Sequence, residues 1–187
     1  MDIHNRFRRA IDEFDRRVQA VDDDQWQGPT PCTEWNVRDL VNHVVSEARW
    51  LPPILEGKTM EEVGDRFEGD LLGEDPKGAW EDAASQAVEA VNAPGVLEGS
   101  VHLSYGEKPA KHYLTELTAD ITVHSWDLAR AVGADEQLDE ELVELAYATF
   151  GPQVEEWRAA GVFAAAVEVP AEAERQTQLL ALLGRRV

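Results

Sequence analysis

Residues 109–133 of the chain read PAKHYLTELTADITVHSWDLARAVG. Along this stretch apolar or ring side chains recur at steps of three and four residues, at Leu114, Leu117, Ile121, His124, Leu128 and Val132. This spacing matches the period of an α-helix and predicts a helix over 109–132, the longest of the chain. Gly133 follows directly and is a natural residue to end it.

The same periodicity predicts further helices over 2–22, 36–50, 76–92, 138–160 and 172–184. Most of the predicted elements are helices, so the expected fold class is mainly all-α. We expect a four-helix bundle within residues 1–160, with long crossover connections, and a small C-terminal extension over residues 161–187 that packs on it.

Glycine and proline mark the connections between these helices. The pair Pro52-Pro53 is expected to end or sharply kink the helix at 36–50, and Gly151-Pro152 to kink the one at 138–160. Residues 58–74 are rich in Gly, Asp and Glu, which predicts a loop with at most one helical turn. Residues 101–106 alternate apolar and polar side chains, so a short strand and an extended connection are both compatible with them.

Charge excludes several classes of function. The chain has 187 residues with 17 Lys and Arg against 37 Asp and Glu, a formal net charge of −20. So acidic a chain is a poor match for nucleic acid or for anionic lipid. No apolar run is long enough to cross a bilayer, and the charged N-terminus does not resemble a signal peptide. A single cysteine, Cys32, cannot form an internal disulfide, and these features together favour a cytoplasmic protein.

Metal-binding chemistry is suggested by histidines and carboxylates at helical spacing. Asp120 and His124 are four residues apart, so about 40° of rotation separates them on one helix face. His43 lies beside the apolar stripe of the helix at 36–50 and reaches the same point if the two helices are neighbours. Two imidazoles and one carboxylate can hold a divalent cation and leave positions open for water or substrate. The alternative is a local Asp–His hydrogen bond without a metal.

Other residues are secondary candidates around such a centre. Glu47 is a second carboxylate one turn after His43, and Asp127 either pairs with Arg130 or orients a ligating His124. Trp126 is a candidate for the wall of a pocket. Cys32 is either a nucleophile or a small apolar residue in a turn.

Three stretches resemble a known family. They are Trp26 followed by PTPCTEWNVRDLVNHV at 29–44, DITVHSWDLARA at 120–131, and the ending VEVP at 167–170 with LLALLGR at 179–185. They are similar to the mycothiol-dependent maleylpyruvate isomerase N-terminal domain family, part of the DinB/YfiT-like superfamily of metal-binding four-helix bundles, and to a compact actinobacterial branch of it.

The resemblance implies a metal centre made of His43, Asp120 and His124. Zinc is the expected ion, with nickel, iron and manganese as alternatives, and mycothiol or a similar low-molecular-weight thiol is the implied co-substrate. The implied activity is that of an S-transferase or isomerase acting on a small electrophile through a metal-bound thiolate, with no separate general base. The resemblance also allows a homodimer through a helix face.

Other functions remain open at this stage. The chain is alternatively a metal- or small-molecule-binding bundle without turnover, or a structural scaffold in which the Asp–His pair is incidental. A redox protein centred on Cys32 is a further hypothesis.

Overall fold

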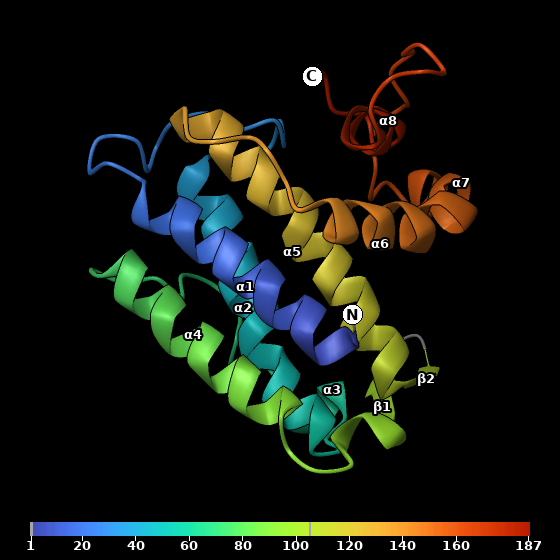
Figure 1. Ribbon diagram of the computed structural model, residues 1–187. Helices are drawn as coiled ribbons and strands as arrows, with labels where there is room; N and C mark the ends of the chain where they lie inside the picture. Colours follow the sequence, from blue (N-terminus) through green and yellow to red (C-terminus); the bar gives the residue numbers. More distant parts are fainter. Residues whose placement is uncertain (1, 105) are drawn as a thin grey trace.

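The computed structural model describes residues 2–104 and 106–187. The bundle consists of α1 (Ile3–Gln19), α2 (Val37–Leu55), α4 (Pro76–Val91) and α5 (Ala110–Val132). Helix α1 packs against α4 and α5, and α2 packs against the same two helices (Figure 1). The order around the bundle is therefore α1, α5, α2, α4, which makes α2 and α5 neighbours.

Caps set the ends of these helices. The side chain of Asn36 accepts a hydrogen bond from the backbone N–H of Asp39, whose carboxylate accepts one from the N–H of Asn36, so a capping box starts α2. Gly133 ends α5 with a φ of 72°, as its position after the apolar stripe predicts.

One expected helix end is wrong. Helix α2 continues through Pro52 and Pro53 to Leu55 instead of ending near residue 50. Both prolines lie in its last turn, where their carbonyls still accept hydrogen bonds from Glu56 and Lys58. Each proline removes one donor, but the buried side chains around them, Leu51 and Ile54 among them, hold the turn against the core.

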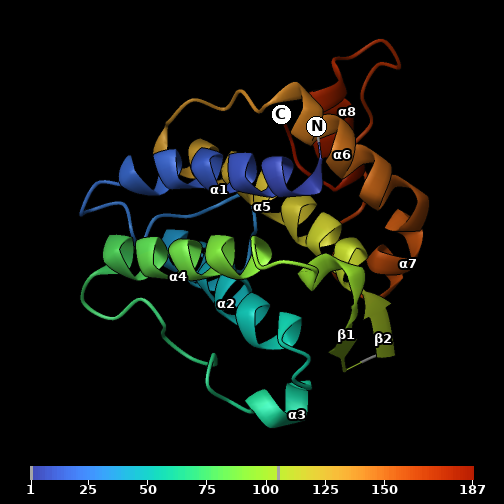
Figure 2. The ribbon, with the colours of Figure 1, turned by 60° about the horizontal axis from the view of Figure 1, so that its bottom comes forward.

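The connections between the helices agree with the sequence-based expectations better than the end of α2 does. A single helical turn, α3 (Met60–Val63), interrupts the 58–74 loop. The 101–106 stretch is not merely extended: β1 (Ser100–Leu103) pairs antiparallel with β2 (Gly106–Pro109), so a small hairpin accompanies the helices. Figure 2 shows this hairpin at the end of the bundle where α5 begins.

The expected helix over 138–160 is divided. It consists of α6 (Glu140–Phe150), a 3₁₀ turn η2 (Gly151–Gln153) and α7 (Val154–Ala159), and another 3₁₀ turn, η1 (Val96–Glu98), precedes β1. The break falls at Gly151-Pro152, as expected. Helix α6 packs on α5 and on the terminal helix α8 (Arg175–Leu182), so the C-terminal part of the chain covers one side of α5 (Figures 1 and 2).

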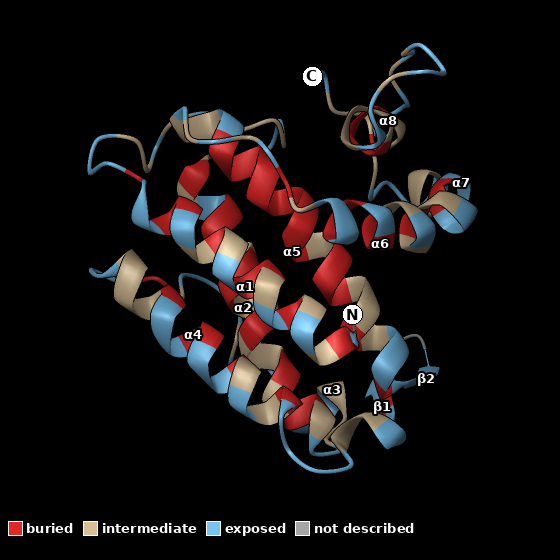
Figure 3. Cartoon of the chain, in the orientation of Figure 1, coloured by how far each residue is buried: buried red, intermediate tan, exposed pale blue. Residues whose placement is uncertain are grey.

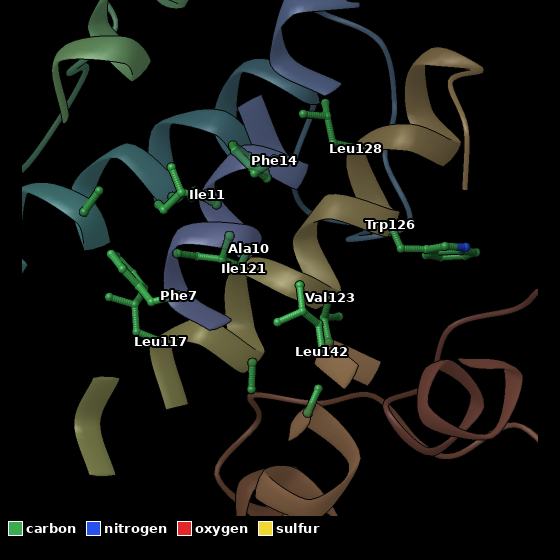
Figure 4. Packing of buried hydrophobic residues seen from close by; sticks show 14 of the residues in the cluster. Phe7, Ala10, Ile11, Phe14, Leu117, Ile121, Val123, Trp126, Leu128 and Leu142 are labelled. Atoms are coloured by element: carbon green, nitrogen blue, oxygen red, sulfur yellow. The ribbon is translucent and has the colours of Figure 1, made fainter. Parts of the chain in front are cut away.

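Helix α5 is the centre of the core and is buried over most of its length (Figure 3). Phe7, Ile11 and Phe14 of α1 lie close to its apolar side chains (Figure 4). Its buried hydroxyls, Thr118, Thr122 and Ser125, each donate to the carbonyl four residues earlier, so they need no partner from another helix. Two ionisable residues, His124 and Asp127, are also buried in this helix. Across the described residues, no helix is both long and apolar enough to span a membrane.

Candidate metal centre

His43, Asp120 and His124 lie together at the contact between α2 and α5. The carboxylate of Asp120 is placed between the two rings, with Oδ2 3.5 Å from Nε2 of His43 and Oδ1 3.5 Å from Nε2 of His124. The two imidazole centroids are 5.1 Å apart. One nitrogen or oxygen from each residue falls within 4.8 Å of the others.

This spacing fits a small divalent cation. Four ligands at zinc distances and tetrahedral angles are separated from one another by roughly 3.4 Å. The two Asp120–imidazole separations of 3.5 Å match that value. Two imidazoles and one carboxylate are also a ligand set that zinc accepts in sites with an open coordination position. The residues present therefore fit the group that the resemblance implies.

One side of the cluster faces solvent. The side chains of His43 and Asp120 are 29% and 32% exposed, whereas His124 is 8% exposed. An open depression of about 420 Å³ lies over His43 and is lined by Glu34, Trp35, Asp39 and Asn42. A cation held by the three side chains would therefore keep accessible positions on this side.

Trp35 forms the wall next to both imidazoles. Its ring centroid is 4.7 Å from that of His43 and 5.8 Å from that of His124. The capping box at Asn36 and the hydrogen bond from Trp35 N–H to the carbonyl of Cys32 fix the turn that carries it. Sequence reasoning did not separate Trp35 from the other tryptophans, although its place directly before a helix cap was a usable signal.

The orientation of His124 is set by Asp127. Nδ1 of His124 is 3.0 Å from Oδ2 of Asp127, so its Nε2 is the nitrogen turned toward Asp120. A carboxylate on the far ring nitrogen is the usual support of a metal-ligating histidine. Asp127 therefore takes the orienting position, and Arg130 pairs with Glu136 instead.

Arg185 and Cys32 complete the surroundings of Asp127. Arg185 donates from Nη2 to Oδ2 at 2.8 Å and from Nε to Oδ1 at 3.2 Å, and the Cys32 thiol donates to Oδ2 at 3.4 Å. Sequence reasoning missed Arg185, 58 residues away from Asp127. Its only signal was its place in the LLALLGR ending that carries part of the resemblance.

Burial and charge act in opposite directions on these groups. Burial alone raises the pKa of Asp127, but the hydrogen bond from His124 and the charge of Arg185 outweigh it and hold that pKa well below its ordinary value. Burial lowers the pKa of His124, yet the charge of Asp120 and the hydrogen bond to Asp127 leave it raised. For Asp120, burial is outweighed by the charge of His124 and the hydrogen bond from His43, so its pKa is lowered.

The two remaining candidates occupy different places. Glu47 lies near the cluster, where burial, opposed by the charge of His43, raises the pKa of its carboxyl. Trp126 is turned away: two positions from His124 on a helix is about 200° of rotation. It is fully buried, with the guanidinium of Arg130 5.0 Å from its ring centroid, and in Figure 4 it points away from the labelled α1 side chains.

A second group of possible ligands, Cys32, His124 and Asp127, also falls within 4.8 Å. Both oxygens of Asp127 are already engaged by Arg185, and the thiol of Cys32 donates to one of the same oxygens. His43, Asp120 and His124 therefore form the better centre.

Cys32 is poorly suited to act as a nucleophile. Burial, followed by the charge of Asp127, raises the pKa of its thiol from 9.0 to about 12. In the metal-free protein we expect iodoacetamide at pH 8 to alkylate Cys32 about a thousandfold more slowly than the same residue after unfolding. The reagent reacts with the thiolate, and the thiolate fraction falls about tenfold for each unit by which the pKa of the thiol rises above the pH. Mass spectrometry of the alkylated protein, folded and in denaturant, measures the ratio. Equal rates in the two states would restore the nucleophile hypothesis.

Comparison with known proteins gives a consistent set of matches. The family model of the mycothiol maleylpyruvate isomerase N-terminal domain matches residues 7–129. Two uncharacterized proteins of Mycobacterium tuberculosis, from strains CDC 1551 / Oshkosh and ATCC 25618 / H37Rv, are each 36% identical over 188 residues, covering 96% of this chain and 95% of theirs.

Solved structures agree in fold. The mycothiol-dependent maleylpyruvate isomerase and a mutant of it superpose with TM-scores of 0.64 and 0.66 at 16% sequence identity. In each case 86% of this chain and 73% of the solved chain are covered. At this identity the likeness concerns the fold.

Proposed function

The chain belongs to the mycothiol maleylpyruvate isomerase N-terminal domain family, and from this premise we propose that it binds one divalent metal ion, zinc by preference, through His43, Asp120 and His124. We further propose that it uses this centre to transfer a low-molecular-weight thiol, mycothiol or a close analogue, to a small electrophile. The observation that carries the proposal is that the carboxylate of Asp120 lies 3.5 Å from Nε2 of both His43 and His124, with one ligand atom of each residue within 4.8 Å of the others and one side of the cluster open.

His43, Asp120 and His124 would hold the cation, which would supply the positive charge that lowers the pKa of a nearby thiol and makes the thiol nucleophilic at neutral pH. The chain's own residues supply the geometry. Asp127 holds the ring of His124, and the exposed sides of His43 and Asp120 leave room for the thiol and its reaction partner. Trp35 covers the two imidazoles on one side and restricts the access of water to them.

The lining of the depression favours an uncharged reaction partner. Glu34 and Asp39 contribute carboxylates, and no lysine or arginine lines this depression within the described part of the chain. The net charge of −20 acts in the same direction. Apart from the metal ion itself, this lining offers a dicarboxylate no positive charge to offset the repulsion from Glu34 and Asp39, so we propose a neutral electrophile.

The proposal is tested with mycothiol and 1-chloro-2,4-dinitrobenzene. In this reaction the thiol gives its proton to the buffer, its sulfur bonds to the ring carbon, and chloride leaves with the bonding electrons. We expect zinc-loaded protein to accelerate thioether formation at least tenfold above the uncatalysed rate, and protein stripped by a chelator to lose the acceleration until zinc is returned. Absorbance of the thioether measures the rate.

The controls separate the competing functions. Zinc in buffer at the same concentration corrects for catalysis by free metal. If the protein binds one zinc but accelerates no reaction with this or other neutral electrophiles, the non-catalytic metal-binding bundle is the correct function. If it binds no metal at all, the scaffold alternative holds.

A further inference from the structure

The C-terminal segment supplies an arginine to the interior of the bundle, next to the proposed metal centre. Arg185 is 11% exposed and its partner Asp127 is fully buried. The guanidinium makes two hydrogen bonds, Nη2 to Oδ2 and Nε to Oδ1, so it holds both oxygens of the carboxylate in one plane. Asp127 lies within residues 7–129, the part matched by the family model, whereas Arg185 lies outside it.

Local sequence explains how Arg185 reaches this position. Helix α8 ends in a Schellman motif, in which the N–H of Gly184 bonds to the carbonyl of Ala181 and the N–H of Arg185 to that of Leu180. The motif requires the φ of +84° that Gly184 adopts, and a Cβ there would come within 2.6 Å of Ala164. Leu179, Leu180 and Leu183 are fully buried and anchor the helix. The backbone at the end of α8 therefore helps to place Arg185 next to Asp127.

Asp127 links this arginine to the metal centre. Its Oδ2 contacts both Nη2 of Arg185, at 2.8 Å, and Nδ1 of His124, at 3.0 Å. A carboxylate held at both oxygens cannot rotate, so the direction of its hydrogen bond with His124 is set. The ring of His124 is then held with Nε2 toward Asp120, 3.5 Å away.

We propose that Arg185 is a positioning residue of the metal centre, and that the C-terminal segment sets metal affinity through Asp127 and His124. This inference rests on the proposed function for the presence of the metal. It adds that metal binding depends on the C-terminal segment, which is distant in sequence from the three proposed ligands.

Electrostatics and positioning predict opposite effects for removal of Arg185. If the arginine acted only as a nearby positive charge, its loss would reduce repulsion of the cation and strengthen binding. If it positions the carboxylate, its loss releases Asp127 and His124 and weakens binding. Loss of the group that orients a ligating histidine typically costs 10–100-fold in metal affinity. The sign of the change therefore separates the two explanations.

The experiment measures zinc affinity of the full chain by competition with a chelating dye. We expect Arg185→Met to bind zinc about 10–100-fold more weakly than the wild type, and Arg185→Lys, which keeps the charge and one donor, to fall between them. The matched control is Arg175→Met. Arg175 begins α8, the helix that precedes Arg185, and it pairs with Glu144 at 2.9 Å with 44% of its side chain exposed, so its loss should leave zinc affinity unchanged.

Further outcomes decide between explanations. Combining Arg185→Met with Asp127→Asn should weaken binding no more than Asp127→Asn alone, because both act through one carboxylate. If Arg185→Met binds zinc as tightly as the wild type or more tightly, the positioning role is wrong. If Arg185→Met does not fold, the folded Arg185→Lys variant decides, and wild-type affinity in it overturns the inference. If the wild type binds no zinc, it is the proposed function that fails.

Discussion

Replacing His124 with alanine is expected to abolish stoichiometric metal binding. His124 is the most buried of the three proposed ligands and the only one whose second ring nitrogen is held by a carboxylate. Its loss leaves His43 and Asp120, two side chains with about a third of their surface in solvent. Loss of an orienting partner alone costs 10–100-fold in affinity, so loss of the ligand itself should cost more than about 100-fold.

Elemental analysis of untagged, purified protein measures this effect. We expect about one divalent ion per wild-type chain, as a site of this ligand number holds, and less than about a tenth of that for His124→Ala. The matched control is His112→Ala, since His112 is an exposed histidine of the same helix. Circular dichroism shows whether each variant keeps its helices.

Two outcomes would contradict the metal centre. If neither protein contains metal, and the wild type also takes up no added zinc or nickel, the Asp–His pair serves packing alone. If His124→Ala keeps its metal at wild-type level, the ion is bound elsewhere.

Replacing Asp127 with alanine is expected to cause the largest loss of stability from a single polar residue of this site. The carboxylate is fully buried and accepts hydrogen bonds from Arg185, His124 and Cys32. Without it, the guanidinium of Arg185 stays largely buried with no carboxylate in hydrogen-bond contact. Removing one member of a buried pair typically lowers the free energy of unfolding by about 3–5 kcal/mol.

Urea unfolding of metal-free protein, in the presence of a chelator, measures the loss. The control is Asp70→Ala, which removes the acidic partner of Arg38 from a pair in which the Asp70 side chain is 58% exposed. Exposed pairs contribute about 0–1 kcal/mol, so this variant should unfold almost as the wild type does. The combined replacement of Asp127 by Ala and Arg185 by Met should recover part of the loss, because no buried charge is then unpaired. If Asp127→Ala and Asp70→Ala lower the free energy of unfolding by similar amounts, the buried ion pair stabilises the protein no more than the exposed one does.

Most of the fold is predictable from the sequence because helices follow from local information. Residues 109–133 contain the apolar period, the end signal at Gly133 and the four-residue spacing of Asp120 and His124, and helical geometry alone places those two side chains on one face. The misplaced end of α2 shows the limit of local rules. A pair of prolines usually stops a helix, but Pro52 and Pro53 lie in the last turn of α2, which the packing of Leu51 and Ile54 in the core maintains.

The sequence by itself therefore determined where most of the helices lie, the end signal at Gly133 and the Asp120–His124 pair, since each depends on residues close to one another in the chain. Only the tertiary structure decided that α2 lies beside α5, which brings His43 to that pair. It also decided that Arg185 reaches Asp127 across 58 positions of the chain, and Cys32 across 95. Such contacts depend on which apolar faces pack together, and a helical period shows that a face is buried without showing what covers it.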